Sequence, residues 1–340
     1  MTASAITPVT LLTGYLGSGK TTLLNHILNS PDAPQTAVLI NEFGAVSIDH
    51  LLVREANENI QVLQNGCVCC SVSGDMVRIL RELYFKRAQG EIPAFTRLVI
   101  ETTGLADPAP IMHTLLEMPL VAARYTLSGV VTTVDVTHID AQLDAHPESV
   151  KQIAIADRIV FTKLDIADPV ALAKVRARVR AINPGAITLD ALQAQVNTKA
   201  FFATGLYQPE ERIPDVTNWL RAETYRPVSR RHQDGIGSIS LEYDMPIELD
   251  RLVEAIEMLQ DMRGEQLLRV KGIVNVRGES QPRVVHAVQH TLYPIATLAN
   301  WPDTNHRTRL VFITRDFDVQ AIRDNLDGFL QQKSLEYAAA

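Results

Sequence analysis

Two short runs of residues carry the chemistry that this sequence can be expected to perform. In the first, Gly14, Gly17 and Gly19 precede Lys20 and Thr21 in the stretch GYLGSGKT. Glycines at this spacing let the backbone turn its N–H groups toward phosphate oxygens, and the helix that begins there presents its positive end to the same anion. Lys20 would then reach the β- and γ-phosphates, and the Thr21 hydroxyl would coordinate Mg²⁺. The stretch therefore predicts a site for a nucleoside triphosphate.

The residues around this stretch give it the context that a phosphate-binding loop requires. A short apolar run at 9–12 precedes it and is typical of a buried strand. The residues at 21–28 have the apolar spacing of a helix, which is expected to end near Pro31. Ser18 and Thr22 complete the set of residues that we assign to nucleotide binding in this loop.

The second run, Cys67-Val68-Cys69-Cys70, contains all 3 cysteines of the chain. Thiolates are soft ligands that suit Zn²⁺, Cu(I) or a Co²⁺-like ion. Cys67 and Cys69 lie two residues apart in a loop opened by Asn65-Gly66 and can bind one ion, while Cys70 faces away or completes the set. Three thiolates leave a four-ligand site one ligand short, so a further ligand is expected from Glu42, Glu101 or His113. Two other readings remain open, a set of small buried apolar side chains and a redox-active thiol.

Two acidic residues follow apolar runs that are expected to be strands. Glu101 comes after 97–100, and Glu42 comes after 37–40 in the sequence Asn41-Glu42-Phe43-Gly44. A carboxylate at the end of such a strand can hold Mg²⁺, and Gly104 would let a backbone N–H approach the γ-phosphate. Glu42 is a second candidate for a metal or switch carboxylate. Each residue taken singly can equally be a polar strand end, but the phosphate-binding loop favours function for both.

The sequence Thr162-Lys163-Leu164-Asp165 follows the apolar run at 159–161 and resembles the guanine-binding sequence Asn-Lys-x-Asp. Asp165 would accept hydrogen bonds from guanine N1 and N2, and the stem of Lys163 would pack on the base. Thr162 replaces the usual Asn, which alters one polar contact. The alternative is an ordinary turn at a strand end with a helix cap. A helix or turn cap is also the favoured reading of Asp135, which ends the apolar run before it.

Together these residues resemble the CobW-like family of P-loop GTPases. This is the metal-insertion and metallochaperone branch that includes cobalamin-biosynthesis proteins, zinc chaperones and nitrile hydratase activators. The resemblance is carried by residues 14–22, 41–44, 66–70, 101–104, 106–108 and 162–165, and it extends into 267–272 and 308–313. It therefore covers most of the chain in the expected order.

The resemblance implies a slow GTPase that binds GTP, GDP and Mg²⁺ and whose nucleotide state controls a thiolate metal site. Lys20 and Thr21 then serve phosphate and Mg²⁺, and Glu101 is the carboxylate of the hydrolytic site. Glu42 lies in a switch segment beside the transition metal, for which Zn²⁺ is the first choice and Co²⁺ an alternative. The implied partner is a client metalloprotein or a metal-cofactor pathway, and a homo-oligomer is compatible with this reading.

Two readings from other functional classes stay open. A small-molecule kinase shares the phosphate-binding loop but gives no reason for Thr162–Asp165 or for the cysteines. A metal store or nucleotide-gated scaffold would keep both and show no significant turnover. No residue in the sequence stands out as a catalytic base or an arginine finger, so intrinsic hydrolysis is expected to be slow.

The elements that must position these residues alternate between strand and helix through the first 200 or so residues. This alternation predicts an α/β fold of the P-loop NTPase type, a parallel sheet with helices on both faces and ligands beyond the carboxyl ends of the strands. The expected strands are 9–12, 37–40, 60–63, 97–100, 129–134, 158–161 and 186–189. The expected helices are 74–88, 111–117, 150–156 and 170–182.

Composition divides the chain into a nucleotide-binding domain at 1–206, a proline- and charge-rich linker at 207–237 and a smaller C-terminal α+β domain at 238–333. In the last, we expect strands at 238–243, 267–276 and 309–313, and helices at 246–260 and 319–330. This domain carries no chemical motif, so partner recognition is its expected role. His286 and His290 have the spacing of a helical metal pair, but Val284-Val285 favours a strand, and His232 is expected to be a solvated linker residue.

Bulk properties narrow the class of partner. The formal net charge of −7 gives no electrostatic reason to expect nucleic acid or an anionic membrane. No uncharged apolar run approaches the ~20 residues of a membrane span, and the first residues lack the pattern of a signal peptide. The cytoplasm is the expected location, where thiols stay reduced. A structural disulfide is not expected, because the number of cysteines is odd.

Overall fold

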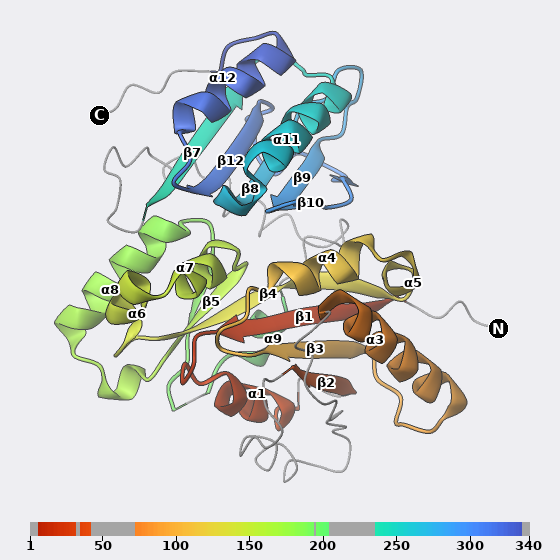
Figure 1. Cartoon of the computed structure of the whole chain (residues 1–340), viewed down its shortest axis with the longest axis vertical. Helices are drawn as coiled ribbons and strands as arrows, with labels where there is room; N and C mark the ends of the chain where they lie inside the picture. The colour runs from red at the N-terminus through yellow and green to blue at the C-terminus, as the bar shows by residue number, and fades with distance from the viewer. Residues whose placement is uncertain (1–5, 32–34, 42–71, 194, 204–234, 335–340) are drawn as a thin grey trace. The chain divides into compact units, whose positions relative to one another are not determined.

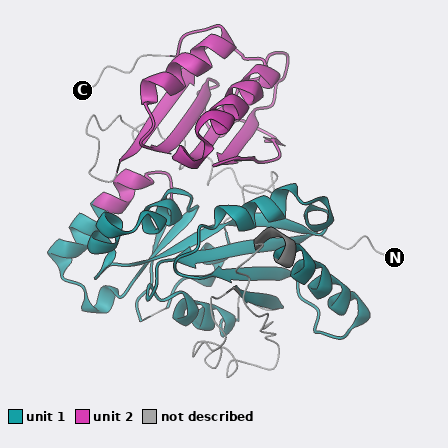
Figure 2. Cartoon of the chain, in the orientation of Figure 1, with its two compact units in different colours: residues 1–177, 187–205 teal, residues 178–186, 206–340 magenta. Residues whose placement is uncertain are grey.

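The computed structural model describes residues 6–31, 35–41, 72–193, 195–203 and 235–334. The chain forms two compact units, one of residues 1–177 with 187–205 and the other of residues 178–186 with 206–340 (Figure 2). The expected strand at 60–63, most of the expected linker at 207–237, His232, Glu42 and the three cysteines lie outside the described residues.

The first unit is built on a six-stranded parallel sheet with the strand order β2-β3-β1-β4-β5-β6. Its strands are β1 (Thr7–Gly14), β2 (Thr36–Asn41), β3 (Arg97–Thr102), β4 (Tyr125–Asp135), β5 (Arg158–Thr162) and β6 (Ile187–Asp190). The central strands are buried on both faces, which explains why they appear in the sequence as continuous apolar runs. The predicted parallel α/β fold is confirmed. β4 begins four residues earlier than expected, at Tyr125, whose ring is buried.

Helices cover both faces of this sheet (Figure 1). They are α1 (Lys20–Leu28), α3 (Val72–Gln89), α4 (Ala109–Glu117), α5 (Pro119–Ala122), α6 (Ile139–Ala145), α7 (Pro147–Ala154), α8 (Pro169–Ile182) and α9 (Thr198–Phe202). On one face, Leu23 and Ile27 of α1 and Phe201 of α9 share a core with Leu12 and Val160 of the sheet. On the other, α4 contacts β4 and α7 contacts β1. Among the helices that the structure describes, none combines the length and apolar character that crossing a bilayer requires.

Short helices are where the sequence-based expectation for this unit is least accurate. Helix α7 begins at Pro147 rather than at Val150, because proline fits the first turn of a helix, where its missing N–H leaves no bond unmade. It ends at Ala154 rather than at residue 156. Helix α6 has only seven residues and buries only Ile139 and Leu143, so its periodicity is too short to recognise.

The second unit contains an antiparallel sheet with the order β10-β9-β8-β12-β7, to which β11 adds by pairing with β9. Its elements are β7 (Ile236–Tyr243), α11 (Leu249–Arg263), β8 (Leu267–Val274), β9 (Arg283–Val288), β10 (Thr291–Leu292), β11 (Ala296–Thr297), β12 (Thr308–Arg315) and α12 (Val319–Leu330). Helices α11 and α12 lie side by side on one face (Figure 1). The core of the unit lies between this face and the two helices, where Leu252, Phe312 and Leu326 have no exposed surface.

Two expectations for the second unit are corrected by its strand pairing. The helix expected at 246–260 begins only at Leu249, because Ile247 forms a bridge to Val276 and donates its N–H to the Asn275 carbonyl at 2.9 Å. The same bridge ends β8 at Val274 instead of residue 276. His286 lies within strand β9, which rules out a helical metal pair with His290, and its ring stacks on Tyr293 with the centroids 4.3 Å apart.

Replacing Phe312 by alanine tests the core of the second unit. Phe312 is fully buried between the sheet and its two helices. The Phe312→Ala substitution should therefore lower the free energy of unfolding of this unit by about 3–5 kcal/mol. Urea denaturation of the full chain, followed by hydrogen exchange of peptides from 236–330, measures the loss. Met262→Ala is the control, because Met262 is 63% exposed and its truncation should change stability by less than about 0.5 kcal/mol. Equal losses in the two variants would contradict this core.

Candidate functional site

The phosphate-binding loop connects β1 to α1 and has the backbone conformation that its glycines predict. Gly14, Gly17 and Gly19 have φ angles of +141°, +71° and +89°, which other residues adopt only with strain. Gly14 also has no room for a side chain, because a Cβ there would lie 2.2 Å from the Thr133 Oγ1 and 2.6 Å from the Thr133 carbonyl oxygen. Strand β4 therefore fixes the start of the loop.

Lys20 and Thr21 open helix α1, where the sequence analysis places the phosphate and Mg²⁺ contacts. The Lys20 ammonium donates to the carbonyl oxygens of Gly14, at 2.9 Å, and of Tyr15, at 3.2 Å, so it lies over the loop. The Thr21 hydroxyl donates to the Glu101 carboxylate at 2.8 Å. The structure thus brings together the two residues expected to hold Mg²⁺. A hydroxyl and a carboxylate are hard oxygen ligands of the kind that Mg²⁺ prefers, so the pair fits this ion.

A row of buried threonines follows the carboxyl ends of four adjacent strands and binds the loop. Thr102 of β3 donates to the hydroxyl of Thr13 in β1 at 2.8 Å. Thr133 of β4 donates to the Thr13 carbonyl at 3.2 Å and lies 2.7 Å from the Ser18 hydroxyl. Either hydroxyl can be the donor in this second bond. Sequence analysis assigned Ser18 to the phosphate and did not identify this row.

The fourth threonine, Thr162, is the residue that replaces asparagine in the guanine-binding sequence. Its hydroxyl donates to the Ser18 carbonyl at 2.8 Å and lies 3.2 Å from the Val134 carbonyl. The end of β5 is therefore attached directly to the phosphate-binding loop. Thr162 thus links the two loops of the site, and its effect on contacts with a base stays a prediction.

The residues expected to read the base follow Thr162 directly. Lys163 has the left-handed conformation, with φ +60°, and caps a single turn of 3₁₀ helix, η1 (Leu164–Ile166). Asp165 lies in this turn with its side chain exposed to solvent. The Lys163 ammonium donates to the Asp135 carboxylate at 2.7 Å. The residues expected to read the base thus lie at the same edge of the sheet as the phosphate-binding loop.

Asp135 caps the turn that follows β4, as the sequence suggests, and it also contacts Lys163 and His138. Its Oδ1 accepts from the Thr137 N–H at 2.9 Å and from the Thr137 hydroxyl at 2.5 Å, and its Oδ2 is shared by Lys163 and His138. Burial works to raise the pKa of Asp135, but the hydrogen bonds from Lys163, Thr137 and His138 outweigh it and hold the pKa below the ordinary value. The carboxylate is therefore ionised at neutral pH.

The loop after Glu101 packs directly on the phosphate-binding loop. A Cβ on Gly104 would lie 2.5 Å from the Leu16 backbone nitrogen, so only glycine permits this approach. On its other side the loop is held by α7, where the buried Gln152 amide donates to the carbonyls of Gly104, at 3.2 Å, and Ala106, at 3.0 Å. Lys151 of the same helix forms a 3.0 Å ion pair with Asp107.

Helix α7 also reaches the phosphate-binding loop itself, because the ring of its cap residue, His146, stacks on Tyr15 with the centroids 4.7 Å apart. Sequence analysis missed His146, Lys151 and Gln152. No motif marks them, and Gln152 lies 48 residues from the glycine that it contacts.

Of the residues expected to bind a transition metal, only Glu101 and His113 are described. His113 lies on α4 and is half-buried, and its role as an auxiliary ligand stays a prediction. Within the described part of the chain, no three His, Cys, Asp or Glu side chains are grouped as a metal site would require. Glu42, Cys67, Cys69 and Cys70 lie outside the described residues, and their assignment also stays a prediction.

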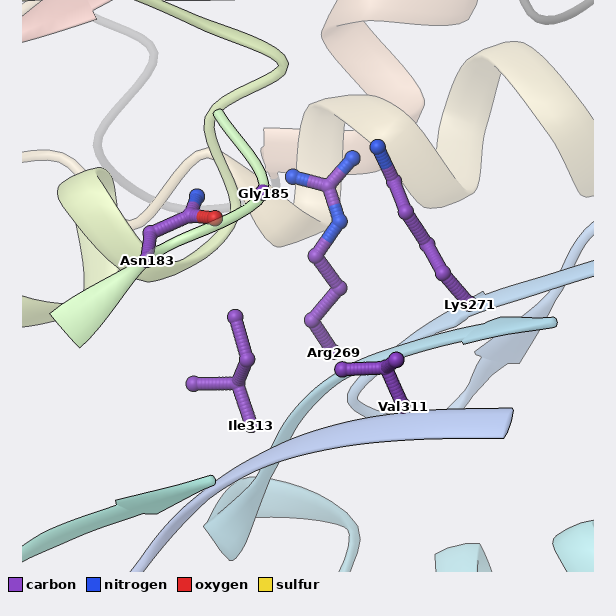
Figure 3. A pocket seen from close by; sticks show the side chains of 6 residues that line it. All are labelled: Asn183, Gly185, Arg269, Lys271, Val311 and Ile313. Atoms are coloured by element: carbon purple, nitrogen blue, oxygen red, sulfur yellow. The ribbon is translucent and has the colours of Figure 1, made fainter. Parts of the chain in front are cut away.

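The second unit has a small pocket of a different character (Figure 3). Arg269 and Lys271 of β8 extend from the sheet toward Asn183 and Gly185, beside Val311 and Ile313 of β12. The four strand residues of this pocket alternate with those that face α11 and α12, so their side chains lie on the other face of the sheet. The pocket lining therefore combines two cationic side chains with an amide and two aliphatic side chains.

Comparisons with known proteins add to this geometry. The model of the CobW/HypB/UreG nucleotide-binding domain matches residues 8–190, and the model of the cobalamin synthesis protein cobW C-terminal domain matches residues 236–330. The zinc chaperone YjiA of Escherichia coli (strain K12) is 35% identical over 320 residues, which are 94% of this chain and 98% of that protein. The zinc chaperone CobW of Pseudomonas aeruginosa is 29% identical over 357 residues, covering 94% of this chain and 90% of that protein. The crystal structure of Zn(II)-bound YjiA GTPase from E. coli matches with a TM-score of 0.71 and 29% identity, over 95% of this chain and 99% of that chain.

The close approach at Gly104 can be tested by adding one methyl group. The Gly104→Ala substitution forces the backbone of the phosphate-binding loop to move, so we expect affinity for nucleoside diphosphate to fall by at least about tenfold, or 1.4 kcal/mol. Isothermal titration calorimetry measures the change. Gly328→Ala is the matched control, because a Cβ at this helical position meets nothing within 4 Å and alanine favours a helix. Unchanged affinity in Gly104→Ala would show that the contact does not shape the site.

Proposed function

This chain belongs to the CobW family of CobW/HypB/UreG nucleotide-binding proteins, and on that basis we propose that it is a GTP-hydrolysing zinc chaperone. In this proposal the first unit binds and hydrolyses GTP, and the segment with the three cysteines binds Zn²⁺. The nucleotide state controls release of the metal to a client protein. The observation that carries the proposal is the 2.8 Å hydrogen bond between Thr21 and Glu101. Glu101 lies in β3, which pairs with β2, and Glu42 is the residue that follows β2 in the sequence.

Nucleotide binding and hydrolysis are supported by the arrangement around helix α1. Lys20 provides a positive charge that can neutralise the β- and γ-phosphates, and the N–H groups of the loop and of the start of α1 add to it. Thr21 and Glu101 would hold Mg²⁺, which when bound neutralises charge on the phosphate oxygens. Gly104 brings the following loop to the same place, where its N–H can meet the γ-phosphate. Turnover is expected to be slow.

A preference for guanine is supported by the position of Thr162–Asp165. The register between β4 and β5 pairs Asp135 with Thr162, the last residue of β5. Lys163 and Asp165 therefore lie in the loop at the carboxyl end of β5. Asp165 is exposed on its 3₁₀ turn, where a carboxylate can accept from two donors on a guanine ring. Thr162 keeps this loop attached to the phosphate-binding loop. Base and phosphates would therefore be bound by parts of one connected structure.

Zinc handling is supported by the relatives and by the path of the chain. Two relatives that align with more than nine-tenths of this chain are named zinc chaperones. In the sheet, Ile40 pairs with Glu101 and Asn41 with Thr102, so the chain leaves β2 next to the carboxylate expected to hold Mg²⁺. Glu42 is the next residue, and the segment that contains the cysteines ends where α3 begins, at Val72. Zn²⁺ suits a set of thiolates completed by a carboxylate.

This path suggests how the nucleotide state would change the affinity of the protein for the metal. Contacts with a γ-phosphate and Mg²⁺ can order a loop that hydrolysis then releases. Because Glu42 follows the strand that pairs with β3, a change at Glu101 or in the loop after it can act on Glu42 across one pair of strands. GTP would then favour tight zinc binding and GDP its release to the client.

A substitution at Thr21 tests the hydrolytic part of the proposal. Thr21→Ala removes the hydroxyl that contacts Glu101, so Mg²⁺-dependent GTP hydrolysis should fall by at least about 100-fold. Thr21→Ser keeps the hydroxyl and should retain most of the activity. Phosphate release from GTP measures both variants, with removal of Mg²⁺ by EDTA as a further comparison. Hydrolysis that survives in Thr21→Ala would contradict the assigned role.

Zinc affinity in different nucleotide states tests the chaperone part. With Mg²⁺ present, Zn²⁺ should bind at least about tenfold more tightly with a non-hydrolysable GTP analogue than with GDP, as expected for a coupling free energy of about 1–3 kcal/mol. Competition with a chromophoric chelator measures both affinities on the reduced protein, and Co²⁺ provides a spectroscopic check. The difference should disappear in Cys69→Ala. Equal zinc affinity in every state, with normal GTP hydrolysis, would leave a GTPase without nucleotide-gated metal delivery.

A further inference from the structure

The carboxylate of Asp135 lies at the centre of a group of polar contacts that the reaction itself does not use. Its side chain is 3% exposed and lies at the end of β4. Oδ1 is satisfied by Thr137, through the backbone N–H at 2.9 Å and the hydroxyl at 2.5 Å. Oδ2 contacts the Lys163 ammonium at 2.7 Å and the His138 Nδ1 at 2.9 Å. The two oxygens therefore have different roles, because one caps the turn and the other binds the lysine.

The register of the sheet fixes the distance between Asp135 and Lys163. Asp135 pairs with Thr162 across β4 and β5, and Lys163 is the next residue. Lys163 also has the left-handed conformation, which is unfavourable for a residue with a side chain. A charge-assisted hydrogen bond to a buried carboxylate helps to offset this cost. The ammonium end of Lys163 is thus held at β4, while its backbone stays at the start of the base-reading turn.

We propose that Asp135 is a positioning residue for guanine, because its Oδ2 holds the Lys163 ammonium so that the aliphatic stem of this lysine forms a surface for the base. This inference rests on the proposed function. A free lysine stem has several rotatable bonds, and ordering it on binding would reduce affinity. Asp135 provides that order before the nucleotide arrives. Because its side chain is only 3% exposed, we expect Asp135 to act through Lys163 and not by contact with the nucleotide.

Asp135→Asn separates this role from capping. An asparagine can keep its amide oxygen on Thr137, so the turn remains capped, but it presents an uncharged NH₂ group in place of Oδ2. GDP should then bind about tenfold more weakly, while thermal stability changes little. Pyrophosphate has no base, so its affinity should be unchanged. Asp140→Asn is the matched control, because Asp140 forms an exposed ion pair with Lys174 at 2.6 Å and lies only five residues further along the chain.

A double-mutant cycle gives the decisive measurement. Lys163→Met keeps an apolar stem and removes the ammonium, and it should weaken GDP binding about as much as Asp135→Asn does. If Asp135 acts through Lys163, the double variant should bind GDP no more weakly than either single variant. Additive losses, an unchanged affinity in Asp135→Asn, or an equal loss of pyrophosphate affinity would each overturn the inference.

The unmodified protein is titrated first with GDP and ADP, which distinguishes the two possible failures. If GDP is not preferred, the proposed GTPase function fails. If GDP is preferred but the two substitutions act additively, only the role of Asp135 fails.

Discussion

The position of the phosphate-binding loop depends on hydroxyl groups that are removed from water at the carboxyl edge of the parallel sheet. Thr13, Thr133 and Thr162 lie on three adjacent strands, and together with Ser18 they bind the loop through hydrogen bonds of 2.7–3.2 Å. Each bond contributes only about 1 kcal/mol net, but a buried hydroxyl left without its partner costs more than that. All of these groups are satisfied only when the strand ends are level, so the register of the sheet and the shape of the loop determine each other.

Local signals made much of this structure predictable. The phosphate-binding loop follows from three glycines beside a lysine, because those residues are needed at those positions whatever the rest of the fold is. The buried strands are visible as continuous apolar runs, and the strand character of β9 was evident from Val284 and Val285. Glu101 was expected to hold Mg²⁺ because it ends such a run, and its hydrogen bond with Thr21 is compatible with that role, which stays a prediction.

The parts that could not be predicted depend on contacts between residues far apart in the chain. Gln152 and Lys151 hold the loop after Glu101 from a helix whose sequence has no recognisable motif. The second oxygen of Asp135 contacts Lys163 only because β4 and β5 pair in one particular register. Helix α11 begins at Leu249, later than the sequence predicts, because Ile247 is used in a bridge to Val276. In each case a local pattern allowed several outcomes, and packing selected one.

The order of the strands places the two predicted activities on supports of unequal stiffness. The phosphate-binding loop extends from β1, which has a hydrogen-bonded strand on each side. The segment with Glu42 and the cysteines extends from β2, which lies at the edge of the sheet and, among the described strands, pairs only with β3. Local unfolding of an edge strand requires less free energy than opening the centre of a sheet. The end of β2 can therefore yield while β1 keeps its shape, so in the proposed function the more easily deformed strand is the one that leads to the segment expected to bind and release zinc.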